Sequence, residues 1–300
     1  MALKQIKNKI IATKKTGQVT KAMESVSAVK MRKSQERAFA SRSYVHTALR
    51  ILARLSHNGK TTSHPLITPR TEGAVLAVVV TSDKGLAGSV NSAVLKQAEI
   101  LFAQSEEVEV IAVGRKAVEF AERSKKTVLG TYTNVKDGVT LSDVYDLTEK
   151  TIRAFMTGRY KKVVVLYQNF ISTFEQVPVV RQVLPVSASE IADVMRGIKP
   201  KTGKFSQDRL APDTFVPYTV EPSPEEVLNT LVPQLIEIMF YHALLESKAS
   251  EHSARMVAMK NATDKSKEMV KALTIKFNNK RQAAITAEVS EITAGVESMK

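Results

Sequence analysis

The sequence predicts an α/β protein built from two long terminal helices and a central domain with a mostly parallel sheet. Two observations carry this prediction. The first is that residues 3–56 and 224–299 contain very little proline or glycine and repeat apolar residues at helical spacing. The second is a middle region in which β-branched runs alternate with helical patterns, an order typical of parallel sheets.

The C-terminal stretch, from Pro224 onward, is the longest predicted element. Leucine, alanine, methionine, lysine and glutamate dominate it, and all of them favour helix. Steps of alternate threes and fours from Leu228 to Ala294 land mostly on apolar residues, which is the spacing of a coiled-coil seam. Such a helix measures on the order of 100 Å at ~1.5 Å per residue, so it must pack along another long helix. Pro233 either kinks this helix or marks its start, and the sequence leaves both open.

The N-terminal stretch predicts a second long helix, weakened near Gly17. Its apolar face is narrow, beginning at Leu3, Ile6 and Ile10, and the remaining face is basic. Both terminal seams are narrow and rich in alanine, which lets two helices approach closely. We therefore expect one antiparallel coiled coil, because a parallel pair would require the middle domain to return the chain along the whole rod.

The strands of the middle region are indicated by apolar, β-branched runs. Continuous runs indicate strands buried on both faces, and a strand that contains Pro178 is predicted at a sheet edge. The predicted strands are 74–80, 108–113, 128–132, 162–167 and 177–186.

Helices are expected between these strands, so the central domain is predicted to be Rossmann-like. Ser142 is the predicted N-cap of the helix that precedes the 162–167 strand. Residues after 186 look like a loose return segment because prolines punctuate them. The predicted divisions are an N-terminal helix (1–57), a central domain (74–200), a return segment (201–223) and a C-terminal helix (224–300).

Composition limits the function. Lysine and arginine outnumber aspartate and glutamate, giving a net charge of +14, so an acidic partner is plausible beside the simpler reading of a solvated basic surface. The chain has no cysteine, which excludes disulfides, thiolate metal sites and a cysteine nucleophile. It has no run of ~18 apolar residues, so no membrane span is predicted. Met1–Ile11 lacks the apolar core of a signal peptide, and a soluble protein in a reducing compartment is expected.

One turn, Thr81–Asn91, invites a chemical interpretation because glycine-containing turns at helix N-termini hold phosphates. Its spacing matches neither common phosphate-binding motif, so a tight turn with a helix cap is the better interpretation. The histidines lack metal-ligand spacing, and no nucleophile motif is present. The sequence therefore predicts no catalytic, cofactor-binding or metal-binding residue, and no free-standing enzyme.

Segments from both ends and from the middle of the chain carry a resemblance to a known family. They are Val19-Thr-Lys-Ala-Met-Glu-Ser-Val26, Val29-Lys-Met-Arg-Lys33, Glu246 to Asp264, Asn279-Lys-Arg-Gln-Ala-Ala-Ile-Thr286, Thr81 to Asn91 and Ser172 to Pro185. In this order they resemble the gamma subunit of F-type ATP synthases, the central rotor shaft. The likeness covers essentially the whole chain. The cysteine-bearing regulatory insert of chloroplast members has no counterpart, so thiol regulation is not implied.

The resemblance implies a role in ATP synthesis without catalysis by this chain. It implies that the coiled coil enters the hexamer of alpha and beta subunits, and that the α/β domain sits near the epsilon subunit and the membrane c-ring. Ion flow turns the ring, and the shaft forces the beta subunits, which hold the ATP chemistry, through their binding states. The expected location is peripheral, on the cytoplasmic face of a bacterial plasma membrane.

The resemblance also implies contact residues. On the C-terminal helix, Arg281, Gln282 and Thr286 match positions that contact beta-subunit loops, and Lys21 and Met23 lie in the matched N-terminal segment. Met23 could equally be an ordinary seam residue. An apolar stripe near the C-terminus is expected to occupy an apolar collar of the hexamer. Its residues are Ile285, Val289, Ile292 and Val296.

Two other classes stay open on the residues alone. A basic coiled coil could bind nucleic acid, but its cations lack aromatic interleaving and the chain has no tryptophan. An enzyme could use the turn from Asp83 to Asn91, and saturable nucleotide binding would support it. The sequence does not decide between proton and sodium coupling, the number of ring subunits or the direction of the reaction.

Overall fold

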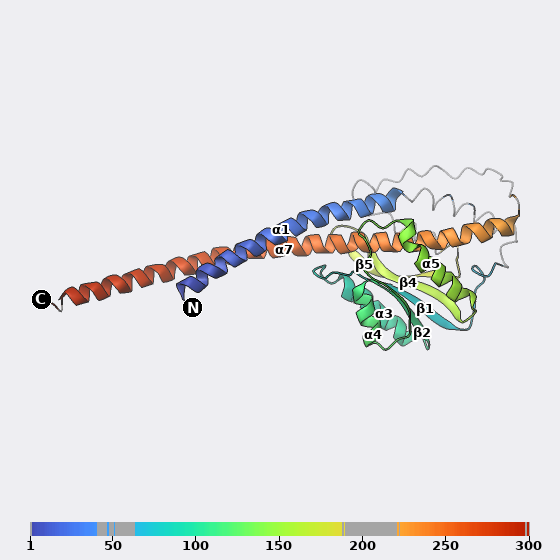
Figure 1. Ribbon diagram of the computed structural model, residues 1–300, viewed down its shortest axis with the longest axis horizontal. Coiled ribbons are helices and arrows are strands. Elements are labelled where there is room, and N and C mark those ends of the chain that lie inside the picture. The colour runs from blue at the N-terminus through green and yellow to red at the C-terminus, as the bar shows by residue number, and fades with distance from the viewer. Residues whose placement is uncertain are drawn as a thin grey trace. The chain divides into compact units, whose positions relative to one another are not determined.

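The structure is a computed structural model, and it describes residues 2–40, 64–187 and 223–297 with isolated positions at 47, 51, 189, 221 and 299. The chain divides into two compact units. The helical unit is Met1–Ser27 with Met256–Lys300, and the body is Ala28–Arg255. Two helices contribute to both units, α1 (Leu3–Ala40) and α7 (Pro224–Glu297) (Figure 1).

The body is organised around a five-stranded sheet with the order β3-β2-β1-β4-β5. β1 pairs in parallel with β2 and β4, and β2 pairs in parallel with β3. β5 pairs antiparallel with β4, which confirms both the mostly parallel sheet and the edge position of the proline-containing strand. The strands are β1 (Ala74–Val80), β2 (Val108–Val113), β3 (Val128–Tyr132), β4 (Tyr160–Phe170) and β5 (Gln176–Leu184).

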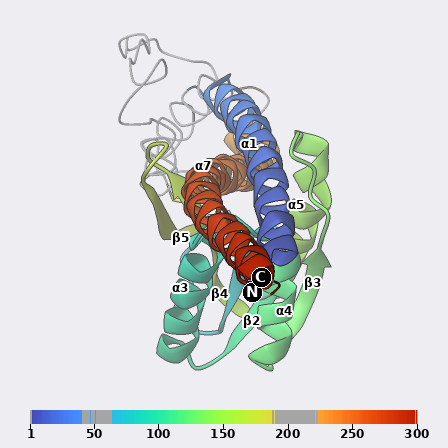
Figure 2. The ribbon, with the colours of Figure 1, turned by 90° about the vertical axis from the view of Figure 1, so that its left-hand side faces the viewer.

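Helices cover both faces of this sheet, as continuous β-branched strands require. One face packs against α3 (Val90–Gln104) and α4 (Arg115–Arg123), through alternate β1 residues that include Val75. The other packs against α5 (Leu141–Met156) and the first part of α7, through the neighbouring β1 residues. Figure 2 shows α3 and α5 on opposite sides of the sheet.

The first part of α7, as far as Leu245, supplies much of the body's core. Leu228, Val232, Leu235, Ile236 and Phe240 are buried in the same cluster as β1 and α5. By length and composition α7 could cross a membrane, but 56% of its apolar window is buried inside the structure. The apolar residues of its first part are those of a core helix, since they belong to the same buried cluster as the sheet.

The start of α7 lies at Pro224, which settles one open question. Proline fits the first helical position, where no intrahelical partner for an N–H exists. The Ser223 hydroxyl accepts a hydrogen bond from the Glu226 N–H at 3.2 Å, as an N-cap does. Pro233 therefore lies inside the helix rather than at its start.

The predicted cap of α5 was wrong by two residues. Thr140, not Ser142, precedes the helix, and its side chain and the Asp143 side chain form a capping box. The Thr140 N–H donates to Asp143 Oδ2 at 2.8 Å. Hydrogen bonds from Thr140 hold the pKa of Asp143 below its usual value. Ser142 is the second residue of the helix.

The helical unit is an antiparallel pair of α1 and α7, as predicted. Thr20 Oγ1 and Thr263 Oγ1 are 2.7 Å apart in a buried contact. Towards the N-terminus, Thr13 Oγ1 lies 3.9 Å from the sulfur of Met269, so α1 numbers fall as α7 numbers rise. Gly17 allows this approach, because a Cβ there would lie 3.3 Å from the Ser266 Cβ.

The predicted domain boundaries stay predictions. Residues 201–220, and most of 41–57 and 188–200, lie outside the described residues. The described part of the N-terminal helix ends at Ala40.

Candidate functional site

The strand order locates the place where an open parallel sheet normally binds its ligand. β1 connects outward to β2 on one side and has β4 on the other, so the order reverses between β1 and β4. Ligands of such sheets bind outside the carboxyl ends of the strands at this switch point. Any small-molecule site of the body would be expected there.

In this chain, polar side chains of α7 lie against the end of β4 at that point. Glu246 Oε2 accepts a hydrogen bond from the Phe170 N–H at 2.9 Å. Ser250 donates to the Gln168 carbonyl at 3.1 Å. The side chains of Glu246 and Ser250, and of Ser253 one turn later, are buried. Ser253 continues the row, donating to the Thr173 carbonyl at 2.7 Å. The helix therefore takes the position that a ligand would need.

The turn after β1 is likewise used for structure. One oxygen of Asp83 accepts from the Arg115 N–H at 3.0 Å, and the other accepts from the Val135 N–H at 3.1 Å. Arg255 of α7 donates to the Gly85 carbonyl at 3.2 Å. A carboxylate at the N-terminus of α4 satisfies its N–H and repels a phosphate, so the geometry favours a structural turn over a nucleotide site.

Gly114 explains how this turn approaches α4 so closely. Its φ is +89°, and a Cβ there would lie 2.1 Å from the Thr81 carbonyl oxygen. No side chain fits, and a glycine is required at this position. The close approach lets Thr81 Oγ1 accept a hydrogen bond from the Ala117 N–H at 2.8 Å.

Two buried titratable groups on α7 are neutral at pH 7. Burial raises the pKa of Glu246 to about 8, against the lowering effects of the Phe170 N–H and of Arg181. Burial lowers the pKa of His242, one turn earlier, to about 4. Neither of these two groups therefore adds a buried charge, which avoids a large desolvation cost. No three His, Asp or Glu side chains gather as a metal site in the described part of the chain.

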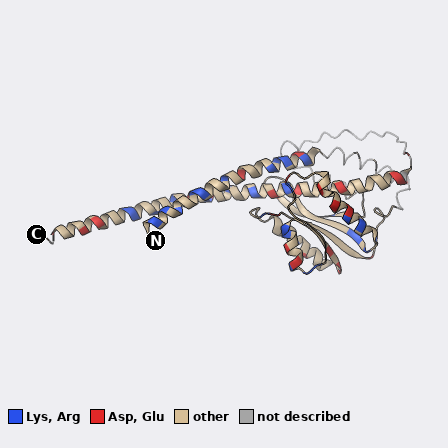
Figure 3. Cartoon of the chain, viewed as in Figure 1, with Lys and Arg blue, Asp and Glu red and all other residues tan. Residues whose placement is uncertain are grey.

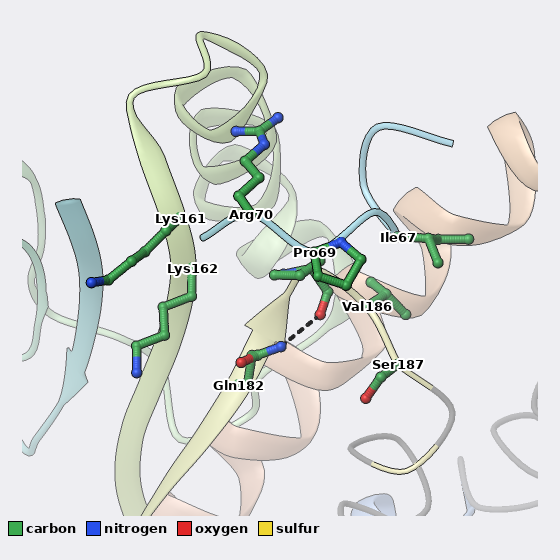
Figure 4. Close-up of a pocket in the computed structure, with 9 residues that line it drawn as sticks. Ile67, Pro69, Arg70, Lys161, Lys162, Gln182, Val186 and Ser187 are labelled. Carbon is green, nitrogen blue, oxygen red and sulfur yellow. Dashed lines mark hydrogen bonds between the residues drawn. The ribbon is translucent and has the colours of Figure 1, made fainter. Parts of the chain in front are cut away.

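A small cavity of about 270 Å³ lies at the opposite end of the sheet (Figure 4). Lys161 and Lys162 extend beside it, while Figure 4 shows the Arg70 guanidinium turned away. Arg70 donates to the Phe155 carbonyl at 2.6 Å and covers that residue's ring at 3.9 Å. Among the described residues that line it there is no histidine and no carboxylate. They are Ile67, Pro69, Arg70, Lys161, Lys162, Gln182, Pro185, Val186 and Ser187.

The helical unit carries a groove of about 640 Å³ along the close approach of α1 and α7. Lys14, Lys21 and Lys267 line it together with apolar groups such as Val270. Figure 3 shows lysines and arginines spaced along both helices. The groove is thus a positively charged surface suited to a carboxylate-bearing partner.

The sequence pointed to one cation of this groove, Lys21, and missed Lys14 and Lys267. Lys14 and Lys21 are seven residues apart, which is two helical turns, so their common face was readable from spacing. Lys267 could be placed beside them only once the register of the two helices was known. Lys21 is exposed and pairs with Glu24 at 3.0 Å, and Met23 is half-buried.

All the predicted contact residues on the C-terminal helix are exposed. Arg281, Gln282 and Thr286 face solvent in the last third of α7. The apolar residues of the stripe are also exposed, Ile285 by 52%, Val289 by 55% and Ile292 by 62%. Apolar residues repeating on one face of an exposed helix indicate a surface that a partner covers.

Comparison with known proteins gives a consistent result over the full chain. The family model described as ATP synthase matches residues 2–299. The chain is 38% identical to the ATP synthase gamma chain of Symbiobacterium thermophilum, covering 99% of this chain and 98% of that one. It is 37% identical to the ATP synthase gamma chain of Geotalea daltonii, covering 100% and 99%.

Solved structures agree on the fold. A chain of the Tetrahymena thermophila mitochondrial ATP synthase central stalk and c-ring structure is 24% identical, with a TM-score of 0.61 over 81% of this chain and 99% of that one. A chain of the Euglena gracilis mitochondrial ATP synthase in rotational state 3 is 16% identical, with a TM-score of 0.65 over 99% and 94%. At these identities the likeness is one of fold.

Proposed function

The chain belongs to the ATP synthase gamma-chain family, and on that premise we propose that it is the central-stalk rotor subunit of an F-type ATP synthase. It transmits torque between an ion-driven membrane ring and a hexamer of alpha and beta subunits. Its contribution is mechanical coupling between conformational states, and the ATP chemistry belongs to the beta subunits. The nucleic-acid and nucleotide-enzyme alternatives are set aside, since no feature of the described residues favours them over family membership.

One observation carries the mechanical role: α7 runs without interruption from Pro224 to Glu297, with its first part in the body and its last part in the helical unit. A rotating force applied to the body is therefore carried into the helical unit by an unbroken helix. At ~1.5 Å per residue the helix is about 110 Å long. Its seam partner, α1, stiffens the helical unit by packing along it.

The partner contacts follow from the two exposed surfaces of the helical unit. The basic groove and Lys21 suit acidic loops of the beta subunits, at a range of about one Debye length, ~8 Å at physiological salt. Met23, which is half-buried, is a further partner contact in the same N-terminal segment. Arg281, Gln282 and Thr286 bind beta-subunit loops farther along α7.

The apolar stripe of Ile285, Val289 and Ile292 runs inside an apolar collar of the hexamer. A shaft must turn within its housing, so this stripe makes contacts that slide rather than interlock. The body contacts the epsilon subunit and the c-ring. In a bacterium the complex lies on the cytoplasmic face of the plasma membrane, and this chain is a peripheral part of it with no membrane span of its own.

Co-purification tests this proposal. A tagged form of the chain is isolated from its native membranes in mild detergent, its partners are identified, and ATPase activity is assayed. Recovery of alpha and beta subunits in stoichiometric amounts, with ATPase activity, is the expected result. Recovery of the chain alone, or with nucleic acid, would contradict it and would return attention to the turn at Asp83.

A further inference from the structure

A rotor body must hold its helices against slipping, and the apolar packing of the body does not do this by itself. The hydrophobic effect is non-directional, so an apolar face resists separation better than it resists rotation or sliding. Directed hydrogen bonds and ion pairs fix a helix in one orientation. The question is where in the body such contacts reach both α1 and α7.

They gather in the last ten residues of α7 before the body ends, from Glu246 to Arg255. This segment is buried but polar, unlike the apolar segment that precedes it. Ser250 and Ser253 fasten it to the end of β4 and to the following turn, as described above. On another side of the helix, Lys248 donates to the Val135 carbonyl at 3.0 Å.

Asp137 stands at the centre of these contacts. It lies on the loop between β3 and α5, and one of its oxygens is 2.7 Å from Lys30 Nζ on α1. Its other oxygen is 3.1 Å from His252 Nε2, although these two atoms lack hydrogen-bond geometry, and 4.0 Å from Lys248 Nζ, both on α7. A single carboxylate of the body thus reaches both terminal helices.

The charges around Asp137 keep it ionised. Burial acts to raise its pKa, but the hydrogen bond from Lys30 and the nearby charge of Lys248 outweigh this, so the pKa lies below its ordinary value. Burial lowers the pKa of His252, which favours its neutral form. Glu251 complements the cations of α7, lying 3.6 Å from Lys248 Nζ and 2.6 Å from Arg255. The network alternates in charge, which favours one arrangement of the two helices.

An ion pair as exposed as Lys30–Asp137, with 40% of each side chain accessible, adds little to folding stability. The ion pair instead determines the position of α1, because it holds α1 against the loop that also contacts α7. We propose that Asp137 is the positioning residue through which the body fastens both terminal helices, so that torque passes from the body to α1 and α7 together. This inference rests on the proposed rotor function and names where torque enters the helices.

Torsional stiffness is the measurement that separates this role from a merely structural one. The chain is assembled with its alpha and beta subunits, and a bead is attached to the body through a biotin-acceptor peptide inserted beside Glu106, at the exposed turn after α3. The angular variance of the bead is recorded while the motor pauses. Thermal variance is inversely proportional to stiffness, so looser fastening gives a larger variance.

The expected result is that Asp137→Ala and Lys30→Met each increase the variance, while ATP hydrolysis without load is unchanged. The matched control is Glu149→Gln, which removes an ion pair with Arg153 within α5. It is expected to leave the variance unchanged. Lys30→Met also keeps the contacts of α7 with Asp137, so it remains informative if Asp137→Ala folds poorly.

A covalent replacement gives the rescue test. Because the chain has no cysteine, Lys30→Cys with Asp137→Cys can be bridged by a short bis-maleimide without side reactions in this chain. The variance is expected to be high before bridging and to return to the original value after it. Unchanged variance in both single variants, or no recovery on bridging, would overturn the role of Asp137. Failure of the unsubstituted chain to rotate at all would instead refute the rotor function.

Discussion

The body and the helical unit are built on opposite principles. In the body, one face of the sheet forms a dense apolar cluster with α5 and the first part of α7, and the other face forms a second cluster with α3 and α4. In the helical unit the seam is made of small and hydroxyl side chains, such as Gly17 and the Thr20–Thr263 pair, while apolar residues such as Ile285 face outward. Most of the free energy of folding therefore comes from the body, whereas the helical unit exposes surfaces that partners can bind.

This contrast makes core substitution the strongest test. Phe155→Ala removes a fully buried ring that also packs under Arg70, and is expected to cost about 3–5 kcal/mol of unfolding free energy. The matched change in the helical unit is Phe277→Ala, where the ring is half-buried, and about 1 kcal/mol is expected. Urea unfolding followed by circular dichroism measures both. Equal losses would show that the two units do not differ in this way.

The second prediction concerns pH and the body alone. The pKa of Glu246 is raised from 4.5 to about 8, so the folded state retains a proton that the unfolded chain releases. The contribution of this group is fully present below pH 4.5 and is lost as the pH rises through about 8. Glu246→Gln is neutral at every pH and should remove this loss, on the order of a few kcal/mol.

The measurement for Glu246→Gln is unfolding free energy between pH 5 and pH 9, compared with the unsubstituted chain. The variant should match it at low pH and exceed it at high pH. Glu225→Gln, an exposed change at the start of the same helix, is the control and should follow the unsubstituted chain throughout. A parallel decline in all three chains would show that Glu246 is charged in the folded state.

The third prediction addresses the seam of the helical unit. Thr263→Val removes one hydroxyl of a buried pair and should destabilise the seam by about 1 kcal/mol. The double variant Thr20→Val with Thr263→Val should cost less than the two single changes added together, because each single change already removes the contact between the two hydroxyls. Amide hydrogen exchange near both positions measures this locally. Strict additivity would mean that the two hydroxyls do not interact.

The smallest effect on stability is expected at the exposed stripe, where function should change most. Ile285→Ser with Val289→Ser should alter the unfolding free energy by less than about 0.5 kcal/mol, since both side chains face solvent. In the assembled complex, the same chain should show lower torque, as should a chain truncated from Ile285 onward. Full torque in both chains would show that the stripe is not part of the surface that contacts the hexamer.

Most of the fold could be predicted from the sequence because its patterns are local and strong. The run from Ala74 to Val80 has no polar residue, which indicated burial on both faces, and Pro178 indicated an edge. The cap of α5 was misplaced because Ser142 and Thr140 are both good capping residues. They are distinguished by the side chain of Asp143, which accepts a hydrogen bond from the Thr140 N–H.

The contact network could not be predicted, because it depends on how distant segments meet. Asp137, Lys30 and His252 are far apart in sequence, and nothing in their spacing relates them. Likewise, the position of α7 at the switch point of the sheet could be predicted only from the strand order and from the register of the helix against β4. His242 and His252 are both buried, and their burial follows only from packing.

The rotor account is tested most directly by watching the body turn. The chain is assembled with alpha and beta subunits fixed to a surface, a bead is attached beside Glu106, and ATP is added. The account predicts continuous rotation of the bead in one direction, with steps that follow ATP hydrolysis. Hydrolysis at a normal rate with a bead that only fluctuates would contradict it, because this chain would then not carry the torque.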